Sequence, residues 1–260
     1  MPSYQEQTSC TGQKKMDNRL TIVIPVFNEG ESVEAVLDSI FEHVRPPVEV
    51  LVVYDTPDDT TAPVLAGYAA RESRVRPLLN TYGRGPANAI RFGLDNAVSS
   101  VAVVMMADGS DDPAQVEQIA GLIECGKAVV AAASRYMSGG RQFGGPLIKR
   151  TLSRVAGLSL YYFGRVGTHD ATSSFKAYSL PFIQEVGIDS DRGFEIGIEM
   201  VAKARRARLP VAEVPTTWRD RTEGESNFRV AAWIPYYLKW YFHALGPARP
   251  VELSPVEEGS

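Results

Sequence analysis

The stretch LTIVIPV, residues 20–26, is the first strongly apolar run of the chain and decides how the segments after it are interpreted. It is rich in apolar and β-branched residues without polar alternation, which is typical of a strand covered on both faces of a sheet. The polar pair Asn28 and Glu29 follows, and residues 30–42 then repeat apolar side chains at helical spacing. Buried strand, polar turn and amphipathic helix together indicate the first unit of an α/β domain.

The same order recurs along the first half of the chain. Strands are predicted at residues 48–54, 75–79, 101–106 and 128–133, and helices at residues 60–72, 86–97 and 113–125. Buried strands that alternate with helices predict a mainly parallel central sheet flanked by helices, so the expected fold class is α/β. Ligands of such sheets bind beyond the carboxyl ends of the strands, so the polar residues after each strand are candidates for a site.

The second half is less regular. Helices are predicted at residues 147–163, 193–206 and 230–245, with a strand at 211–218 and a polar loop at 219–227. The first of these helices carries Lys149, Arg150 and Arg154 on one face. We expect one domain over residues 19–228, with halves at 19–135 and 136–228, then an aromatic amphipathic helix at 229–246 and disordered tails at 1–18 and 247–260.

Charge and hydropathy exclude several classes of protein. The net charge of −4 gives no overall basic field, so we expect no nucleic acid partner. Residues 1–18 lack the apolar core of a signal peptide, and no stretch reaches the roughly 18–20 apolar residues that span a bilayer. The expected location is the cytoplasm, either free or on the cytoplasmic face of a membrane.

Three acidic or polar clusters follow three of the predicted strands. They are residues 28–29, 55–59 and 108–112. Acids that converge at one sheet edge need cations or donors between them, and a nucleoside diphosphate with Mg²⁺ or Mn²⁺ would supply both. The alternative is that Asp55, Asp58 and Asp111 only cap helices and form turns. No phosphate loop ending in Lys-Ser or Lys-Thr and no dinucleotide-binding glycine triplet is present, which disfavours nucleotidases and dehydrogenases.

Seven segments occur in an order that is specific when taken together. They are IVIPVFNEGESV (22–33), VVYDTPDDTT (52–61), GRGPANAIRFGL (83–94), VVMMADGSDDP (103–113), ASRYMSGG (133–140), DATSSFKAY (170–178) and EVPTTWRDRTEGESNF (213–228). This series resembles the family 2 glycosyltransferases, in particular the polyprenyl-phosphate branch that contains the short dolichol-phosphate mannosyltransferases without transmembrane helices. The resemblance runs from about residue 20 to residue 245.

The resemblance implies a GT-A fold, a Rossmann-like single domain with acceptor-side helices at its C-terminal end. It implies a glycosyltransferase, a hexosyltransferase that inverts the sugar. The donor would be a GDP- or UDP-linked mannose or glucose, the acceptor a polyprenyl (dolichol-type) phosphate, and the cofactor Mg²⁺ or Mn²⁺. Residues 19–135 would bind the nucleotide sugar, and residues 136–228 the acceptor.

The resemblance also assigns roles residue by residue. The donor would be held by residues after the strands and in the late loop: Pro25, Phe27, Glu29, Asp55, Ala107, Asp108, Ser110, Asp111, Arg221 and Ser226. Asp108 would bind the metal, and Asp108, Arg135 and Arg221 would be catalytic. The acceptor phosphate would meet Arg135, Lys149, Arg150, Ser153 and Arg154, and the sugar pocket would contain Asp170, Ser173 and Ser174.

The chain departs from the family pattern at two functional positions and one neighbouring segment. Met106 stands where the first acid of an Asp-x-Asp motif is usual, and Asn227 replaces a Lys in the late loop. Tyr54-Asp55-Thr56 replaces a double Asp and a Gly. These changes suggest weaker dependence on the metal, or another sugar or acceptor.

Several alternatives stay open from the residues. The chain could be a family 2 transferase that acts on a polysaccharide or another acceptor, or a nucleotide-sugar-binding protein without transferase activity. The aromatic helix 230–245 suits either a membrane surface or packing against the domain or a second subunit, which would make a homo-oligomer.

Overall fold

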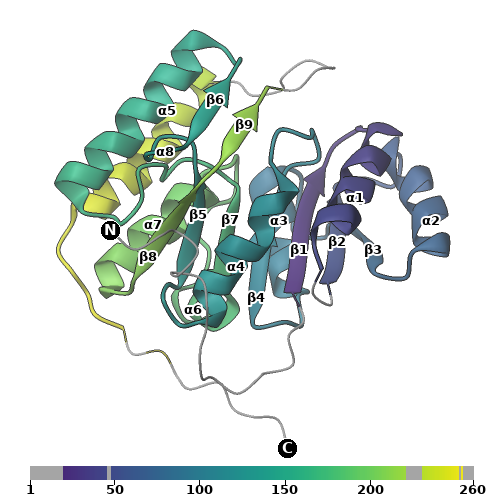
Figure 1. Ribbon diagram of the computed structural model, residues 1–260, viewed down its shortest axis with the longest axis horizontal. Helices are drawn as coiled ribbons and strands as arrows, with labels where there is room; N and C mark the ends of the chain where they lie inside the picture. The colour runs from purple at the N-terminus through teal and green to yellow at the C-terminus, as the bar shows by residue number, and fades with distance from the viewer. Residues whose placement is uncertain (1–19, 46–47, 221–229, 252, 254–260) are drawn as a thin grey trace, which may run out of the picture.

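The computed structural model describes residues 20–45, 48–220, 230–251 and 253, which form a central sheet with helices on both faces (Figure 1). The sheet has seven strands in the order β3-β2-β1-β4-β7-β5-β8. Its strands are β1 (Leu20–Val26), β2 (Val48–Tyr54), β3 (Val75–Leu79), β4 (Val101–Val104), β5 (Val130–Ser134), β7 (Lys176–Ser179) and β8 (Val211–Pro215). The mainly parallel α/β sheet expected from the sequence is confirmed.

Alternate side chains of the sheet divide the apolar core into two clusters. Ile22 and Ile24 of β1 pack with the helices on one face, while Val23 between them packs with those on the other. The first face is covered by α1 (Ser32–His43), α2 (Thr61–Arg71) and α4 (Val116–Glu124). The second is covered by α3 (Pro86–Asp95), α6 (Leu180–Val186), α7 (Ile196–Ala207) and α8 (Val230–Leu245). Of the helices in the described part of the chain, none is long and apolar enough to cross a membrane.

Strand β7 is an element that the pattern of apolar residues did not predict. It lies between β4 and β5 and runs antiparallel to both. Its sequence, KAYS, is short and begins with a lysine, so neither an apolar run nor strict alternation marks it. Lys176 is nevertheless completely buried, because its ammonium group finds partners inside the fold.

Three other predicted elements differ in extent. The strand predicted at 211–218 is interrupted at Thr216, so that β9 (Thr217–Arg219) separates from β8 and pairs in parallel with the unpredicted β6 (Arg141–Phe143). The helix predicted at 147–163 is α5 (Leu147–Ser159), continued by a π-helical turn (Leu160–Gly164). The helix predicted at 113–125 begins with a 3₁₀ turn (Pro113–Gln115).

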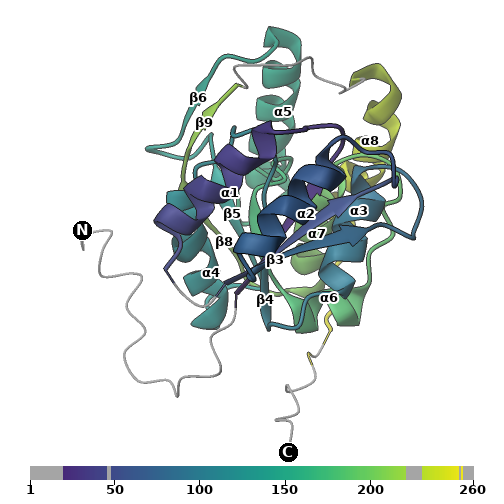
Figure 2. The same cartoon turned by 90° about the vertical axis from the view of Figure 1, so that its right-hand side faces the viewer.

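The carboxyl ends of the parallel strands meet at one edge of the sheet. Asn28, Asp55 and Asp108 follow β1, β2 and β4 there, and Arg135 follows β5. Figures 1 and 2 show α5, β6 and β9 gathered beyond one edge of the sheet. Since β6 and β9 continue the chain directly after β5 and β8, this is the carboxyl edge, where ligands of such sheets bind.

Candidate active site

The first wall of the site is the loop before α3, which Asp55 holds through hydrogen bonds. The carboxylate accepts one hydrogen bond from Asn80 Nδ2 and one from the Gly85 N–H, both at 2.8 Å. Gly85 has φ 120° at the start of α3, and a Cβ there would approach the Arg192 carbonyl oxygen to 2.9 Å, so the turn requires glycine. Asp55 therefore ties β2 to the segment before α3, and each of its oxygens keeps a lone pair for a ligand.

A second acid, Asp59, shapes the turn after β1. It is buried, and its carboxylate accepts the N–H groups of Asn28 and Thr61. Asn28 has φ 55°, a left-handed conformation that this hydrogen bonding supports. The turn projects Phe27, which is 52% exposed and available to stack on a flat ring. Asp59 therefore stabilises a turn, which is the alternative role that the sequence left open for Asp55 and Asp58.

The acids after β4 lie near each other at the same edge. Asp108 accepts the Ser110 N–H at 3.1 Å, and the buried Asp111 accepts the Met106 N–H at 3.0 Å. Burial, reinforced by the negative charge of Asp108, raises the pKa of Asp111 to about 7. A buried carboxyl beside another carboxylate gains from a cation between them.

The donor set after β4 fits a hard divalent cation. Mg²⁺ or Mn²⁺ takes carboxylate oxygens and completes its shell with phosphates and water. Among the described residues, no group of three or more His, Cys, Asp or Glu side chains could hold a metal. Asp108, with Asp111 beside it, would therefore provide one or two ligands, and a diphosphate and water would provide the rest.

The second wall of the site is a buried ion pair. Asp170 accepts two hydrogen bonds from the Arg135 guanidinium, at 2.7 and 2.8 Å, and a third from the Arg135 N–H at 3.0 Å. Burial opposes ionisation of Asp170, but the charge and hydrogen bonds of Arg135 outweigh burial and hold the pKa of Asp170 below its usual range. The pair fixes the guanidinium in one orientation.

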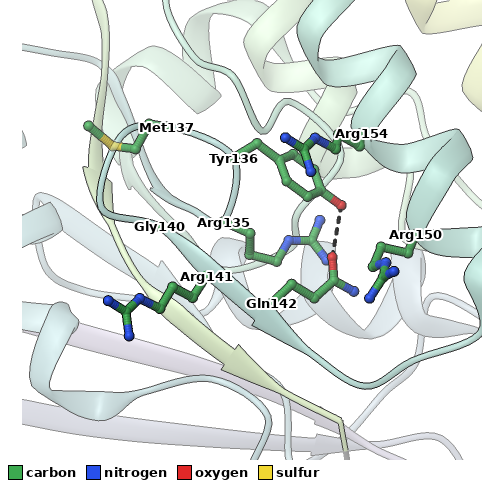
Figure 3. Close-up of a pocket in the computed structure, with 8 residues that line it drawn as sticks. All are labelled: Arg135, Tyr136, Met137, Gly140, Arg141, Gln142, Arg150 and Arg154. Carbon is green, nitrogen blue, oxygen red and sulfur yellow. Dashed lines mark hydrogen bonds between the residues drawn. The ribbon is translucent and has the colours of Figure 1, made fainter.

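Arg135 opens onto a cavity of about 370 Å³ rich in arginine (Figure 3). Its lining is Arg135, Tyr136, Met137, Gly140, Arg141, Gln142, Arg150 and Arg154. Among the described residues, no acidic side chain belongs to this lining. Tyr136 Oη donates to Gln142 Oε1 at 3.1 Å and forms one side of the cavity (Figure 3). Guanidinium groups bind phosphate oxygens in pairs, so the cavity has the chemistry of a phosphate site.

Ser153 links helix α5 to this cavity. Its hydroxyl lies 3.2 Å from Arg135 Nη2, 3.1 Å from Tyr136 Oη and 2.6 Å from Thr172 Oγ1. On the same helix, Arg150 lies about one turn before Ser153 and Arg154 is the residue that follows it. The hydroxyl therefore fixes the position of the helix that carries two of the four arginines.

The structure brings together most of the residues predicted for an acceptor phosphate. Arg135, Arg150 and Arg154 line one cavity, and Ser153 contacts Arg135. Lys149 is on the same helix but is not part of the lining. Arg221 and Ser226 lie outside the described residues.

The residues predicted for a sugar pocket are placed differently. Asp170 is completely buried, and its carboxylate faces Arg135 rather than open space. Ser173 is also buried, and its hydroxyl accepts the Phe175 N–H, which closes a turn. Ser174 is partly exposed. Asp170 therefore forms the wall behind Arg135, and Ser173 shapes the turn before β7.

Sequence reasoning missed several residues of the site. Arg141 and Gln142 belong to β6, which has no apolar pattern, and Tyr136 is recognisable only from its place in the cavity. Lys176 lies within the segment 170–178, whose pattern does not indicate a role for it. Its ammonium group donates to the carbonyls of Asp170, Ala171 and Ser173, and burial lowers its pKa to about 7.

Comparison with known proteins places the chain in a family. Residues 21–187 match the model of glycosyl transferase family 2. Polyprenol monophosphomannose synthase of Mycolicibacterium smegmatis is 29% identical over 231 residues, covering 83% of this chain and 86% of that protein. Undecaprenyl-phosphate mannosyltransferase of Micrococcus luteus is 28% identical over 215 residues, covering 80% and 87%.

Solved structures share the fold at low sequence identity. Glucosyl-3-phosphoglycerate synthase from Mycobacterium tuberculosis, in complex with Mn²⁺, UDP and phosphoglyceric acid, has a TM-score of 0.66 at 19% identity, covering 89% of this chain and 80% of that one. A mannosyltransferase from Pyrobaculum calidifontis, in complex with GDP-mannose and Mn²⁺, has a TM-score of 0.63 at 17% identity, covering 89% and 66%. The fold is that of these GT-A neighbours. Because the family model spans more than half of its length, the chain belongs to glycosyl transferase family 2 and is a glycosyltransferase.

Proposed function

We propose that the enzyme transfers mannose or glucose from a GDP- or UDP-linked donor to a polyprenyl phosphate, with inversion at the transferred carbon. The observation that carries the proposal is the arginine cavity beside the carboxyl edge of the sheet. The guanidinium groups of Arg135, Arg150 and Arg154 suit a phosphate monoester. The two relatives whose names describe phosphorylated polyprenol chemistry support the same acceptor.

The donor would lie at the carboxyl ends of β1, β2 and β4. Phe27 is exposed for stacking on the base, and Asp55 keeps acceptor capacity for hydroxyl or base N–H groups. Asp108, with Asp111 beside it, would hold Mg²⁺ or Mn²⁺ against the diphosphate, and the metal would stabilise the charge of the departing nucleotide. Arg221 and Ser226 would bind the diphosphate as well.

The acceptor phosphate would enter the cavity at Arg135, Arg150 and Arg154. One phosphate oxygen forms the new bond to the sugar carbon while the bond from that carbon to the diphosphate oxygen breaks on the opposite face. The phosphate is an anion at neutral pH, so no proton has to be removed. The site therefore needs positioning and charge stabilisation more than a general base.

The lipid chain of the acceptor would leave the cavity along an apolar surface of α5 and α8. Ile148 and Val155 on α5 are 73% and 60% exposed, and Phe163 in the following turn is 80% exposed. Helix α8 lies against this turn, and Tyr241 Oη of α8 donates to Ser159 Oγ at the end of α5 at 2.9 Å. The exposed side chains of this apolar surface are Leu147, Ile148, Leu152, Val155, Tyr162, Phe163, Leu238, Phe242 and Leu245.

We propose that this apolar surface rests on the cytoplasmic face of a membrane. Large exposed apolar patches mark interaction sites, and a helix with apolar and basic faces suits the boundary of an anionic bilayer. Arg150 and Arg154 flank the patch and would meet lipid phosphates at the height of the acceptor phosphate. Docking there would present the cavity to a phosphate that is anchored in the same membrane.

A direct transfer assay tests the proposal. The purified chain is incubated with Mg²⁺ or Mn²⁺, undecaprenyl or dolichyl phosphate, and GDP-mannose, UDP-mannose, GDP-glucose or UDP-glucose in turn. Mass spectrometry should find a hexosyl phospholipid with one donor, and none when unphosphorylated polyprenol replaces the acceptor. Absence of lipid product with every donor would refute the polyprenyl-phosphate assignment.

A further inference from the structure

A chain of hydrogen bonds runs from Glu213 on β8 to Arg135 in the cavity. Glu213 Oε2 accepts from Thr168 Oγ1 at 2.9 Å and from the His169 N–H at 2.8 Å. Thr168 Oγ1 accepts in turn from the Asp170 N–H at 3.0 Å. Asp170 then holds the guanidinium of Arg135 through both carboxylate oxygens. Glu213 is thus separated from the ion pair by one residue, Thr168, and does not line the cavity.

Because these residues are buried, the series of hydrogen bonds is sensitive to the loss of any one of them. Thr168 and Asp170 are completely buried, and the Glu213 side chain is 10% exposed. Because a buried donor without a partner is unfavourable, the loop at 168–170 would move to recover partners if Glu213 were neutralised. Movement of Asp170 would carry the Arg135 guanidinium with it.

The same loop is also pressed against helix α5. The His169 ring, 2.5 Å from Glu213 Oε1 through Nδ1, stacks on the Tyr161 ring with centroids 3.6 Å apart. A Cβ on Gly157 of α5 would come within 2.2 Å of the His169 carbonyl oxygen. The loop therefore sets the distance between Arg135 and the helix that carries Arg150 and Arg154.

We propose that Glu213 is a positioning residue that fixes Arg135 relative to α5 and so sets the geometry of the acceptor phosphate. This rests on the proposed function, in which the cavity receives that phosphate. We expect the effect on binding of the acceptor because this series of hydrogen bonds ends at Arg135. The donor residues Asp55 and Asp108 are held by other contacts. Neutralising Glu213 should therefore weaken acceptor binding and leave nucleotide binding unchanged.

Three substitutions separate positioning from a general loss of structure. Glu213→Gln keeps the shape but removes the charge that three donor groups face, and Thr168→Val removes the hydroxyl link at similar volume. Each should raise the KM for polyprenyl phosphate by about tenfold, since a shifted guanidinium weakens a charge-assisted bond. Thr168→Ser, which restores the hydroxyl, should return KM to within about twofold of wild type. Glu185→Gln, an exposed glutamate on α6, is the control.

The nucleotide Kd and the melting temperature are measured on the same variants. The proposal predicts an unchanged Kd for the nucleoside diphosphate. An acceptor KM that stays at the wild-type value in both Glu213→Gln and Thr168→Val overturns it, as does an equal loss of nucleotide binding.

Amide hydrogen exchange gives a second test that needs no substrate. The Arg135 N–H donates to Asp170, so Glu213→Gln should speed exchange at residue 135 as well as at residues 168–170. Faster exchange at 168–170 alone would contradict the coupling. If the wild type transfers no sugar to polyprenyl phosphate, the proposed function fails, and the exchange result still decides the role of Glu213.

Discussion

At the scale of single residues, Asp170 and Arg135 form an ion pair that lies almost wholly inside the protein. The side chains are 0% and 12% exposed, whereas the pair of Glu34 and Arg71 on the surface is 36% and 58% exposed. Two buried charges stabilise each other, and removal of one leaves the other without compensation. The surface pair is screened by water and contributes little.

Asp170→Asn should therefore destabilise the protein by about 3–5 kcal/mol, because the Arg135 charge loses its partner. Glu34→Gln should change the free energy of unfolding by about 0–1 kcal/mol. Urea unfolding followed by circular dichroism measures both. Equal effects of the two substitutions would contradict the assignment of Asp170 as the buried counter-charge.

The same residues show how far the sequence could predict the site. Arg135 belongs to the segment 133–140 and Arg150 and Arg154 to a predicted helix, and the family resemblance assigned all three to the acceptor phosphate; the structure places them at one cavity. Asp170 was predicted to line a sugar pocket, because nothing in the sequence indicates that its carboxylate turns inward. Glu213 received no role, since its function depends on a hydrogen-bond chain through a buried loop.

At the scale of elements, the long apolar strands were predictable and the short polar ones were not. β1 and β2 have the predicted bounds because each is an unbroken apolar run. β6 and β7 are three and four residues long and begin with Arg141 and Lys176. They form strands because distant partners pair with them, and a local pattern carries no information about those partners.

Helix α5 depends on a glycine where it crosses the loop before Asp170. Gly157→Ala would place a methyl group 2.2 Å from the His169 carbonyl oxygen, so helix or loop must shift, at a cost of about 1–3 kcal/mol. Gly121→Ala on α4 meets no atom within 4 Å and should stabilise the helix by roughly 0.5–1 kcal/mol. Urea unfolding measures the change in the free energy of unfolding for each variant. A stabilising effect of Gly157→Ala would contradict the close contact.

The apolar surface of α5 and the following turn allows a test of membrane contact. The double substitution Ile148→Gln and Phe163→Gln changes two exposed side chains and should reduce binding to vesicles of mixed neutral and anionic lipid by about tenfold or more. Val98→Gln alters a side chain that is 70% exposed in the loop before β4 and should leave binding unchanged. Vesicle flotation measures the bound fraction, and equal binding by all three proteins would rule out this surface.

At the scale of the whole molecule, the chain separates two kinds of phosphate chemistry. Carboxylates gather after β2 and β4, where a metal can join them to a diphosphate, and guanidinium groups gather after β5 and on α5. The overall charge of −4 conceals this division. The acidic half suits a donor whose diphosphate binds a divalent cation. The basic half suits an acceptor phosphate that binds without a metal.

The central claim is that the arginine cavity receives the acceptor phosphate. The most direct test is the KM for polyprenyl phosphate in Arg150→Gln and Arg154→Gln, with Lys149→Gln as a control that removes the same charge from the same helix outside the cavity lining. The two arginine variants should raise the acceptor KM on the order of tenfold or more, with the donor KM unchanged, and Lys149→Gln should stay near wild type. An acceptor KM that responds equally to all three substitutions, or to none, would contradict the claim.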